Sequence, residues 1–209
     1  MRGHPHLRWE DIDEGQKGGR GRGDRGGGEA GGLSAGGTGQ GMRFIADRSL
    51  GKLSRWLRIL GYDTLYWRGD EKELVELAVK EDRVLLTRIV HLMEEKGFKG
   101  LLIREDNPFR QLKEVIRAFR LPIKEEALFS RCLECNLPLE KVRAEEVEGE
   151  VPEFVLLQHR EFSRCPRCQK VFWPGTHYER MRGLIEEVKR EIEGDGRETE
   201  GKGPSGPTG

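Results

Sequence analysis

Residues 43–67 read RFIADRSLGKLSRWLRILGYDTLYW, and this stretch predicts a strand, a helix and a second strand in succession. Gly61 suits the position just after the end of the helix. Two strands joined by one helix pair in parallel, so the stretch predicts the first unit of a parallel sheet. The apolar residues of the helical part recur at the spacing of one helix face: Leu50, Leu53, Leu57 and Leu60.

The same alternation continues to about residue 121. The run RVLLT at 83–87 is almost wholly apolar, as expected of a strand covered on both faces. Helices are expected at 71–82, 91–97 and 108–120, and a fourth strand at 100–105. This order of elements predicts an α/β domain over 42–125, with helices on both sides of a parallel sheet.

The composition bounds the remaining possibilities. The chain has 209 residues with 37 basic and 37 acidic side chains, so no global field attracts nucleic acid or a membrane. The apolar runs are too short for a membrane span, and the N-terminus lacks the apolar core of a secretory signal. With four cysteines in two close pairs, this favours a reducing, cytoplasmic location.

Two terminal segments are expected to be disordered. Residues 1–41 are rich in glycine and 194–209 are polar and glycine-rich, so neither segment can bury enough apolar surface to offset its conformational entropy. The first segment suggests either a dispensable tail preceding a true start at Met42 or an RGG-like RNA-binding tail.

The cysteines form two C-x2-C pairs that are separated by 29 residues. Two such pairs complete a tetrahedral thiolate site suited to Zn²⁺, and a closed site of this kind is structural. A redox pair and an iron–sulfur cluster are the alternatives. A zinc ribbon with a closing helix is therefore expected over 130–182, with the strand-like run EFVLLQH at 153–159 in a hairpin. The expected zinc ligands are Cys132, Cys135, Cys165 and Cys168.

Aromatic and basic residues surround the second cysteine pair. Phe172 and Trp173 follow it, and Arg164 and Arg167 flank its cysteines. Aromatics with interleaved arginines can stack bases and hold phosphates. The alternative is that the aromatics pack into the small core of the ribbon.

Acidic residues follow several of the predicted strands. Asp47 ends the first strand, Asp70 and Glu71 follow the second, and Asp106 follows the fourth. Carboxyl ends of parallel strands meet at one edge, where gathered carboxylates can hold Mg²⁺ or Mn²⁺ and activate water. Asp70 and Glu71 can instead complement a helix dipole, and Asp106 can serve a turn.

Basic residues line the faces of the first and fourth predicted helices at steps of three or four residues. Such stripes near acidic groups fit a phosphodiester backbone, although solvated helix faces look the same in sequence. The candidate RNA-binding residues are Arg48, Lys52, Arg55, Arg88, Arg110, Lys113 and Arg117.

Several motifs occur in the order seen in a known family: FIADRSLGKLSRWLRILGYDTLYW, RVLLTR, REDNPFRQL, RCLECN and RCPRCQKVFWPGTHYERM. Over about 42–182 the chain resembles the Mut-seven C-terminal ribonuclease family, a PIN-like domain followed by a zinc ribbon. The resemblance implies a divalent-metal nuclease acting on RNA. By position, Asp47 and Asp106 match metal-binding aspartates, and Asp70 or Glu71 matches the acid before the second helix.

The chain departs from the family pattern after the third strand. The family usually has an aspartate after leucine-threonine-arginine, but here Thr87 and Arg88 are followed by Ile89. Isoleucine cannot bind a metal, although the Thr87 hydroxyl can assist the remaining acids. A weakened ribonuclease is therefore the leading hypothesis. A catalytically weak RNA-binding protein and a protein-binding zinc-ribbon adaptor are the alternatives.

Overall fold

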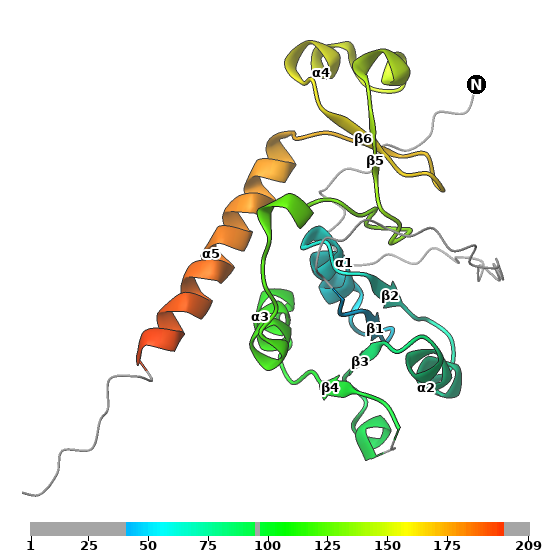
Figure 1. Cartoon of the computed structure of the whole chain (residues 1–209), viewed down its shortest axis with the longest axis vertical. Helices are drawn as coiled ribbons and strands as arrows, with labels where there is room; N and C mark the ends of the chain where they lie inside the picture. The colour runs from blue at the N-terminus through cyan, green and yellow to red at the C-terminus, as the bar shows by residue number, and fades with distance from the viewer. Residues whose placement is uncertain (1–40, 95–96, 199–209) are drawn as a thin grey trace, which may run out of the picture.

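The computed structural model describes residues 41–94 and 97–198, and its larger part is a four-stranded parallel sheet with helices on both faces (Figure 1). The sheet has the order β2-β1-β3-β4, so the predicted α/β class is confirmed. Most of the two predicted tails, residues 1–40 and 199–209, lies outside this described part. The strands are β1 (Phe44–Ala46), β2 (Thr64–Tyr66), β3 (Val84–Thr87) and β4 (Gly100–Leu102).

The helices cover the two faces of this sheet unequally. Helices α1 (Gly51–Ile59) and α3 (Pro108–Phe119) cover one face, and α2 (Glu71–Lys80) covers the other (Figure 1). The alternation along β1 reflects this, because Phe44 packs with α1 and α3 while Ile45 packs with α2. The predicted short helix after β3 is a 3₁₀ turn, η2 (Val90–Glu94).

Local sequence signals set the helix limits. Helix α3 begins after Asn107, whose side chain accepts hydrogen bonds from two backbone N–H groups, and Pro108 occupies the first turn. After α1, Gly61 has a φ of +87°, and a Cβ there would come 2.5 Å from the carbonyl oxygen of Ala127. Only glycine fits that turn, which explains the position of this helix end.

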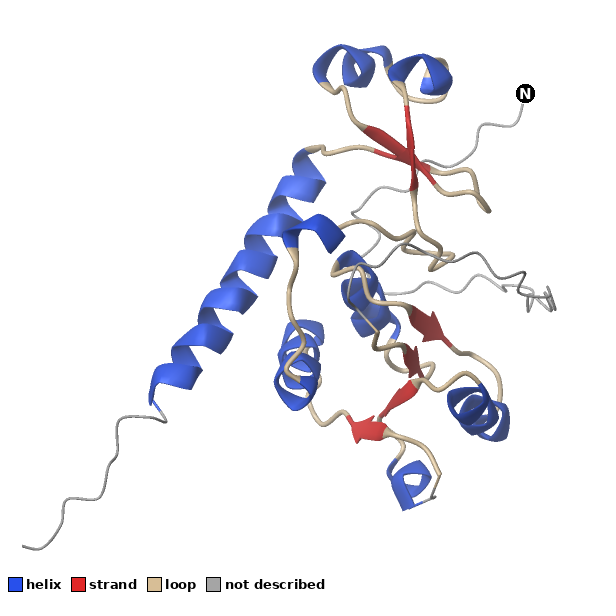
Figure 2. Cartoon of the chain, viewed as in Figure 1, coloured by secondary structure: helices blue, strands red, loops and turns tan. Residues whose placement is uncertain are grey.

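The cysteine-bearing module contains a three-stranded antiparallel sheet of the order β5-β6-β7 (Figure 2). The strands are β5 (Glu140–Val142), β6 (Phe162–Arg164) and β7 (Val171–Phe172), with η4 (Ala144–Val147) and α4 (Glu153–Gln158) between β5 and β6.

The strand expected at 153–159 is wrong, because this run forms the helix α4. Val155 of this helix is buried in one cluster with Phe162, and Leu156 packs against that cluster, whereas Phe154 and Leu157 are exposed.

Helix α5 (Thr176–Glu198) leaves the ribbon and returns to the α/β domain (Figure 1). Met181, Ile185 and Val188 are buried in the same core cluster as α1, α3 and the sheet. The helix also includes residues 194–198, which were expected to belong to the C-terminal tail. No helix in the described segments is long and apolar enough to cross a lipid bilayer.

A buried hydrogen-bond network joins the first cysteine pair to the α/β domain. Arg58 of α1 donates from Nε to the Thr64 carbonyl at 2.9 Å and from Nη1 to the Leu133 carbonyl at 2.5 Å. Asn136, with a φ of +62°, accepts from Thr64 N at 2.9 Å and donates to Asp63 at 2.6 Å. Burial lowers the pKa of Arg58 to about 10, so its guanidinium remains charged at neutral pH.

Asp63 extends this network to the start of β3. Burial alone would raise the pKa of Asp63, but hydrogen bonds from Arg83 and Asn136 outweigh it and hold the pKa below its usual range. The Arg83 guanidinium is 2.7 Å from Asp63 and also bonds the Phe44 carbonyl. The ribbon is therefore fixed to the sheet through polar contacts that are themselves buried.

Candidate functional site

The strand order places Asp47 and Thr87 at the point where the chain reverses its direction of travel through the sheet. From β1 the chain moves outward to β2, then returns past β1 to β3 and continues to β4. Ligands of open α/β sheets bind outside the carboxyl ends of the strands at such a point. Asp47 follows β1 and Thr87 ends the neighbouring β3.

The carboxylate of Asp47 is buried and accepts four hydrogen bonds. Its Oδ1 accepts from Ser49 N at 2.7 Å and from Ser49 Oγ at 2.5 Å. Its Oδ2 accepts from Thr87 Oγ1 at 2.6 Å and from Arg88 N at 2.8 Å. A carboxylate has about four lone-pair sites. The surrounding donors therefore fix Asp47 in one orientation and leave it no unused lone pair.

Asp47 lies at one side of a surface pocket of about 240 Å³. Ile89, at the position where the resemblance implies an aspartate, lines the same pocket and faces the space that Asp47 also borders. The complete lining consists of Asp47, Arg48, Trp67, Gly69, Asp70, Glu71, Leu74 and Ile89.

Asp70 and Glu71 both contribute to this pocket, and each also has a second contact. Asp70 caps α2, because its Oδ1 accepts from Glu73 N at 2.8 Å. Glu71 Oε2 lies 2.7 Å from His91 Nε2. Each residue keeps one carboxylate oxygen outside these contacts, so a capping role and a binding role are compatible.

Asp106 does not line this pocket. Its exposed side chain forms an ion pair with the Arg88 guanidinium, whose backbone N–H donates to Asp47. Among the described residues, no three carboxylate or histidine side chains have ligand atoms all within 4.8 Å of one another. The participation of Asp106 in a shared metal site therefore remains a prediction.

The predicted basic stripes are largely occupied by neighbouring acids. Lys113 forms an ion pair with Glu191 of α5, so that part of the α3 stripe faces a helix. Arg55 lies 3.8 Å from Glu134, and Arg110 lies 4.0 Å from Glu105. Arg117 is exposed on α3, Lys52 is exposed in the first turn of α1, and Arg48 is exposed in the loop before α1, where it lines the pocket.

The four cysteines converge, as the sequence predicts. Their sulfur atoms all lie within 4.8 Å of one another, which is close enough to bind one metal ion. The two pairs have the same backbone geometry, because Cys132 N bonds the Leu137 carbonyl just as Cys165 N bonds the Lys170 carbonyl. Each pair is followed directly by a residue with positive φ, Asn136 at +62° and Gln169 at +61°.

The surroundings of the thiols favour a bound cation. Burial raises the pKa of Cys132, and it raises the pKa of Cys135 to about 11. Burial alone would also raise the pKa of Cys165, but N–H groups of Cys168 and Arg167 outweigh it and lower that pKa. Four thiolates at this separation repel one another, so a cation is needed to hold them deprotonated together.

Several contributors to these sites carry only weak signals in the sequence. Ser49 stands two residues after Asp47, a spacing typical of local side-chain turns, and that was the one available indication. Trp67 lines the pocket, and His91 contacts its lining residue Glu71 from a separate segment. In the sequence Arg58 resembles the basic residues that line the first predicted helix. Its side chain is buried, however, and has a structural role.

The comparisons with known proteins agree with the geometry. A family model described as the Mut7-C RNAse domain matches residues 42–185, which include both the pocket and the cysteine cluster. No curated protein and no solved structure matches the chain significantly.

Proposed function

The chain belongs to the Mut7-C RNAse domain family, and on that premise we propose that it is a ribonuclease that hydrolyses RNA with a divalent cation. In this proposal residues 42–125 form the catalytic domain and 130–182 the zinc-binding module, with α5 packing on the former. The catalytic pocket is the one lined by Asp47, Asp70 and Glu71.

The observation that carries the proposal is the position of Asp47. It is buried at the topological switch point, where it borders a pocket with two further acids. Burial of a carboxylate has a high cost unless its charge is compensated. Here four donors compensate it, at a site where ligands of such sheets bind.

The residues fit a divalent cation in part. Asp70 and Glu71 each have one carboxylate oxygen outside their contacts with Glu73 N and His91, and oxygen is the ligand atom that Mg²⁺ and Mn²⁺ prefer. The two hydroxyl donors to Asp47, from Ser49 and Thr87, can rotate and free lone pairs of its carboxylate. Such an ion would polarise the phosphate and lower the pKa of a bound water.

The protein's own groups would orient the substrate around this site. Arg48 lines the pocket and Lys52 is exposed on the first turn of α1, so both can contact phosphates on either side of the cleaved bond. The Thr87 hydroxyl fixes the orientation of Asp47 rather than contacting RNA, because it is buried against that carboxylate.

For the cysteine cluster we infer structural Zn²⁺. Four thiolates complete the tetrahedral shell of this ion and leave no open position for a substrate. The first cysteine pair is also tied to α1 and β2 through Arg58 and Asn136, as a structural site requires.

Ile89 favours a second candidate function, a catalytically weak RNA-binding protein of the same fold. The side chain lies in the pocket beside Asp47 but brings neither a metal ligand nor a proton acceptor. Loss of one acid from such a cluster can cost orders of magnitude in rate. The basic residues near the pocket would still bind RNA.

The test is cleavage of mixed single-stranded RNAs by the zinc-loaded full chain with added Mn²⁺ or Mg²⁺. Asp70→Asn is the informative variant, because asparagine caps a helix as well as aspartate but removes the charge from the pocket. Glu73→Gln on the same helix is the matched control outside the pocket. Cation-dependent cleavage that falls only in Asp70→Asn supports the proposal, and absent cleavage with retained RNA binding favours the second candidate.

A further inference from the structure

A second hollow lies on the opposite side of the ribbon sheet from its apolar core. It has a volume of about 160 Å³. Residues of the linker, the ribbon and the first turn of α5 surround it. The lining is Leu128, Phe129, Arg131, Leu133, Leu139, Glu161, Ser163, Phe172, Trp173, Pro174 and Tyr178.

Strand alternation gives this side of the sheet its chemistry. Phe162 faces the apolar core formed with η4 and α4, so its neighbours Glu161 and Ser163 face the other way, into the hollow. Ser163 pairs with Lys141 on β5 and with Phe172 on β7. Directly paired residues project from the same face of a sheet, so a cation, a hydroxyl and an aromatic ring form one row.

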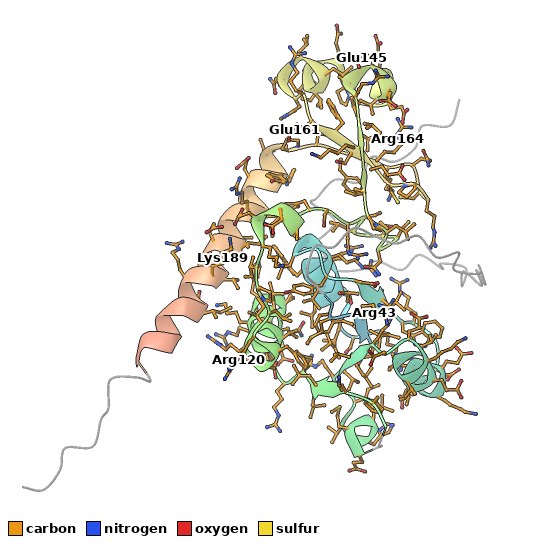
Figure 3. The ribbon with its side chains drawn as sticks, in the orientation of Figure 1. Arg43, Arg120, Glu145, Glu161, Arg164 and Lys189 are labelled. Carbon is orange, nitrogen blue, oxygen red and sulfur yellow. The ribbon has the colours of Figure 1, made fainter. Side chains whose placement is uncertain are left out.

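Two polar side chains of the hollow have no partner within the described part of the chain. Neither the Glu161 carboxylate nor the Ser163 hydroxyl forms a hydrogen bond or ion pair with another described residue. Figure 3 shows Glu161 where the ribbon comes near the start of α5, on the side away from Arg164. The Arg164 guanidinium is instead bound to Glu150 at 2.8 Å.

We propose that this hollow binds one unpaired guanine of single-stranded RNA. Single-stranded RNA is recognised by stacking bases on aromatic side chains and by bonding their Watson–Crick edges. An ionised carboxylate only accepts hydrogen bonds, and its two oxygens match two adjacent N–H donors. Guanine alone among the four bases offers such a pair, N1–H and the N2 amino group, toward Glu161.

The other groups around the hollow fit a nucleotide in the same orientation. Aromatic rings of the lining supply the stacking surface, and the Ser163 hydroxyl can bond the ribose or the base. Lys141 is exposed in the same row and can contact a phosphate at the rim. The inference rests on the proposed function in taking RNA as the ligand, and it adds a base preference at a site separate from the catalytic pocket.

The experiment measures fluorescence anisotropy of labelled oligouridines that carry one central guanine, inosine or adenine. It uses the zinc-loaded full chain without added Mg²⁺ or Mn²⁺. We expect guanine to bind about tenfold more tightly than adenine, the discrimination typical of a bidentate base contact. Inosine should fall between them, because it keeps N1–H but lacks the N2 amino group.

Two variants separate Glu161 from general charge effects. Glu161→Gln should abolish the guanine-to-adenine ratio, whereas Glu145→Gln should preserve it. Glu145 is an exposed acid of the same module on η4, remote from α5 (Figure 3). The variants are compared by their guanine-to-adenine affinity ratio and not by affinity alone, because removing any acid strengthens RNA binding in general.

Equal affinity for all bases, an equal loss of the ratio in both variants, or no RNA binding would each overturn the inference. The last result is also the one expected if the hollow takes a protein side chain. Cleavage with Mn²⁺ is measured separately. Guanine preference without cleavage would refute the proposed function and leave this site standing, and cleavage without guanine preference would do the reverse.

Discussion

Replacing Asp47 with asparagine should destabilise the protein, even though the two side chains have the same shape. All four groups around the carboxylate donate to it, and two of them, Ser49 N and Arg88 N, are backbone N–H groups that cannot become acceptors. An asparagine side chain replaces one of the two carboxylate oxygens by an N–H₂ group. That group then faces one backbone N–H and one hydroxyl, and it cannot accept from the backbone N–H. At least one backbone bond to Asp47 is therefore lost.

The cost follows from the kind of hydrogen bond that is removed. Bonds to a charged acceptor contribute about 1.5–3 kcal/mol each. The asparagine oxygen can still serve Thr87 Oγ1 and Arg88 N, and its amide can donate to Ser49 Oγ after the hydroxyl rotates. The remaining loss is the bond from Ser49 N, which is near solvent, so we expect a decrease of about 2 kcal/mol in the free energy of unfolding.

Urea unfolding of the zinc-loaded protein measures this decrease, with Asp70→Asn as the comparison. Both changes remove one negative charge from the same pocket, but asparagine caps α2 as well as aspartate does, so Asp70→Asn should change stability by only a few tenths of a kcal/mol. Equal stability of the two variants would refute the reasoning from hydrogen-bond saturation. A positive result also means that lost cleavage in Asp47→Asn reflects folding as well as chemistry.

Four further outcomes are expected. Cys165→Ser, or removal of metal by a strong chelator, should lower the melting temperature and release about one zinc per chain, which elemental analysis detects; an unchanged melting temperature would exclude a structural metal. Arg58→Met should lower the free energy of unfolding by about 3 kcal/mol, since it leaves buried carbonyls without donors, and urea unfolding tests this. Ile89→Asp should raise the rate of RNA cleavage by about 10–100-fold, and a rate equal to that of the parent would favour the RNA-binding alternative. A protein beginning at Met42 should keep its melting temperature, whereas a drop of several degrees would show that residues 1–41 contribute to stability.

Local patterns were sufficient to predict the sheet and the cysteine cluster. Within 43–67 the leucines recur at helical spacing between two short apolar runs, and two C-x2-C pairs in one chain are typical of a metal site. The run at 153–159 was misassigned because a short apolar run fits a strand or a helix equally well, and here the packing of Val155 decided.

Local sequence patterns do not predict contacts between segments that are distant in the chain. The ion pair between Arg88 and Asp106 joins two loops, and the ion pair of Lys113 depends on a helix that returns after the ribbon. Sequence position suggested that these residues bind a metal or RNA. The structure shows acids and bases that already contact one another, which only the tertiary arrangement determines.

The return of α5 to the α/β domain has a consequence for protein synthesis. The surface of α1 and α3 that Met181, Ile185 and Val188 cover is made early, but the residues that cover it are translated after the whole ribbon. Until then the nascent chain exposes apolar surface at the ribosome, where chaperones and proteases act. All four cysteines precede these residues in the chain, so we expect the ribbon to be able to take up its metal before the α/β domain is covered, and we expect cells short of zinc to accumulate less of this protein.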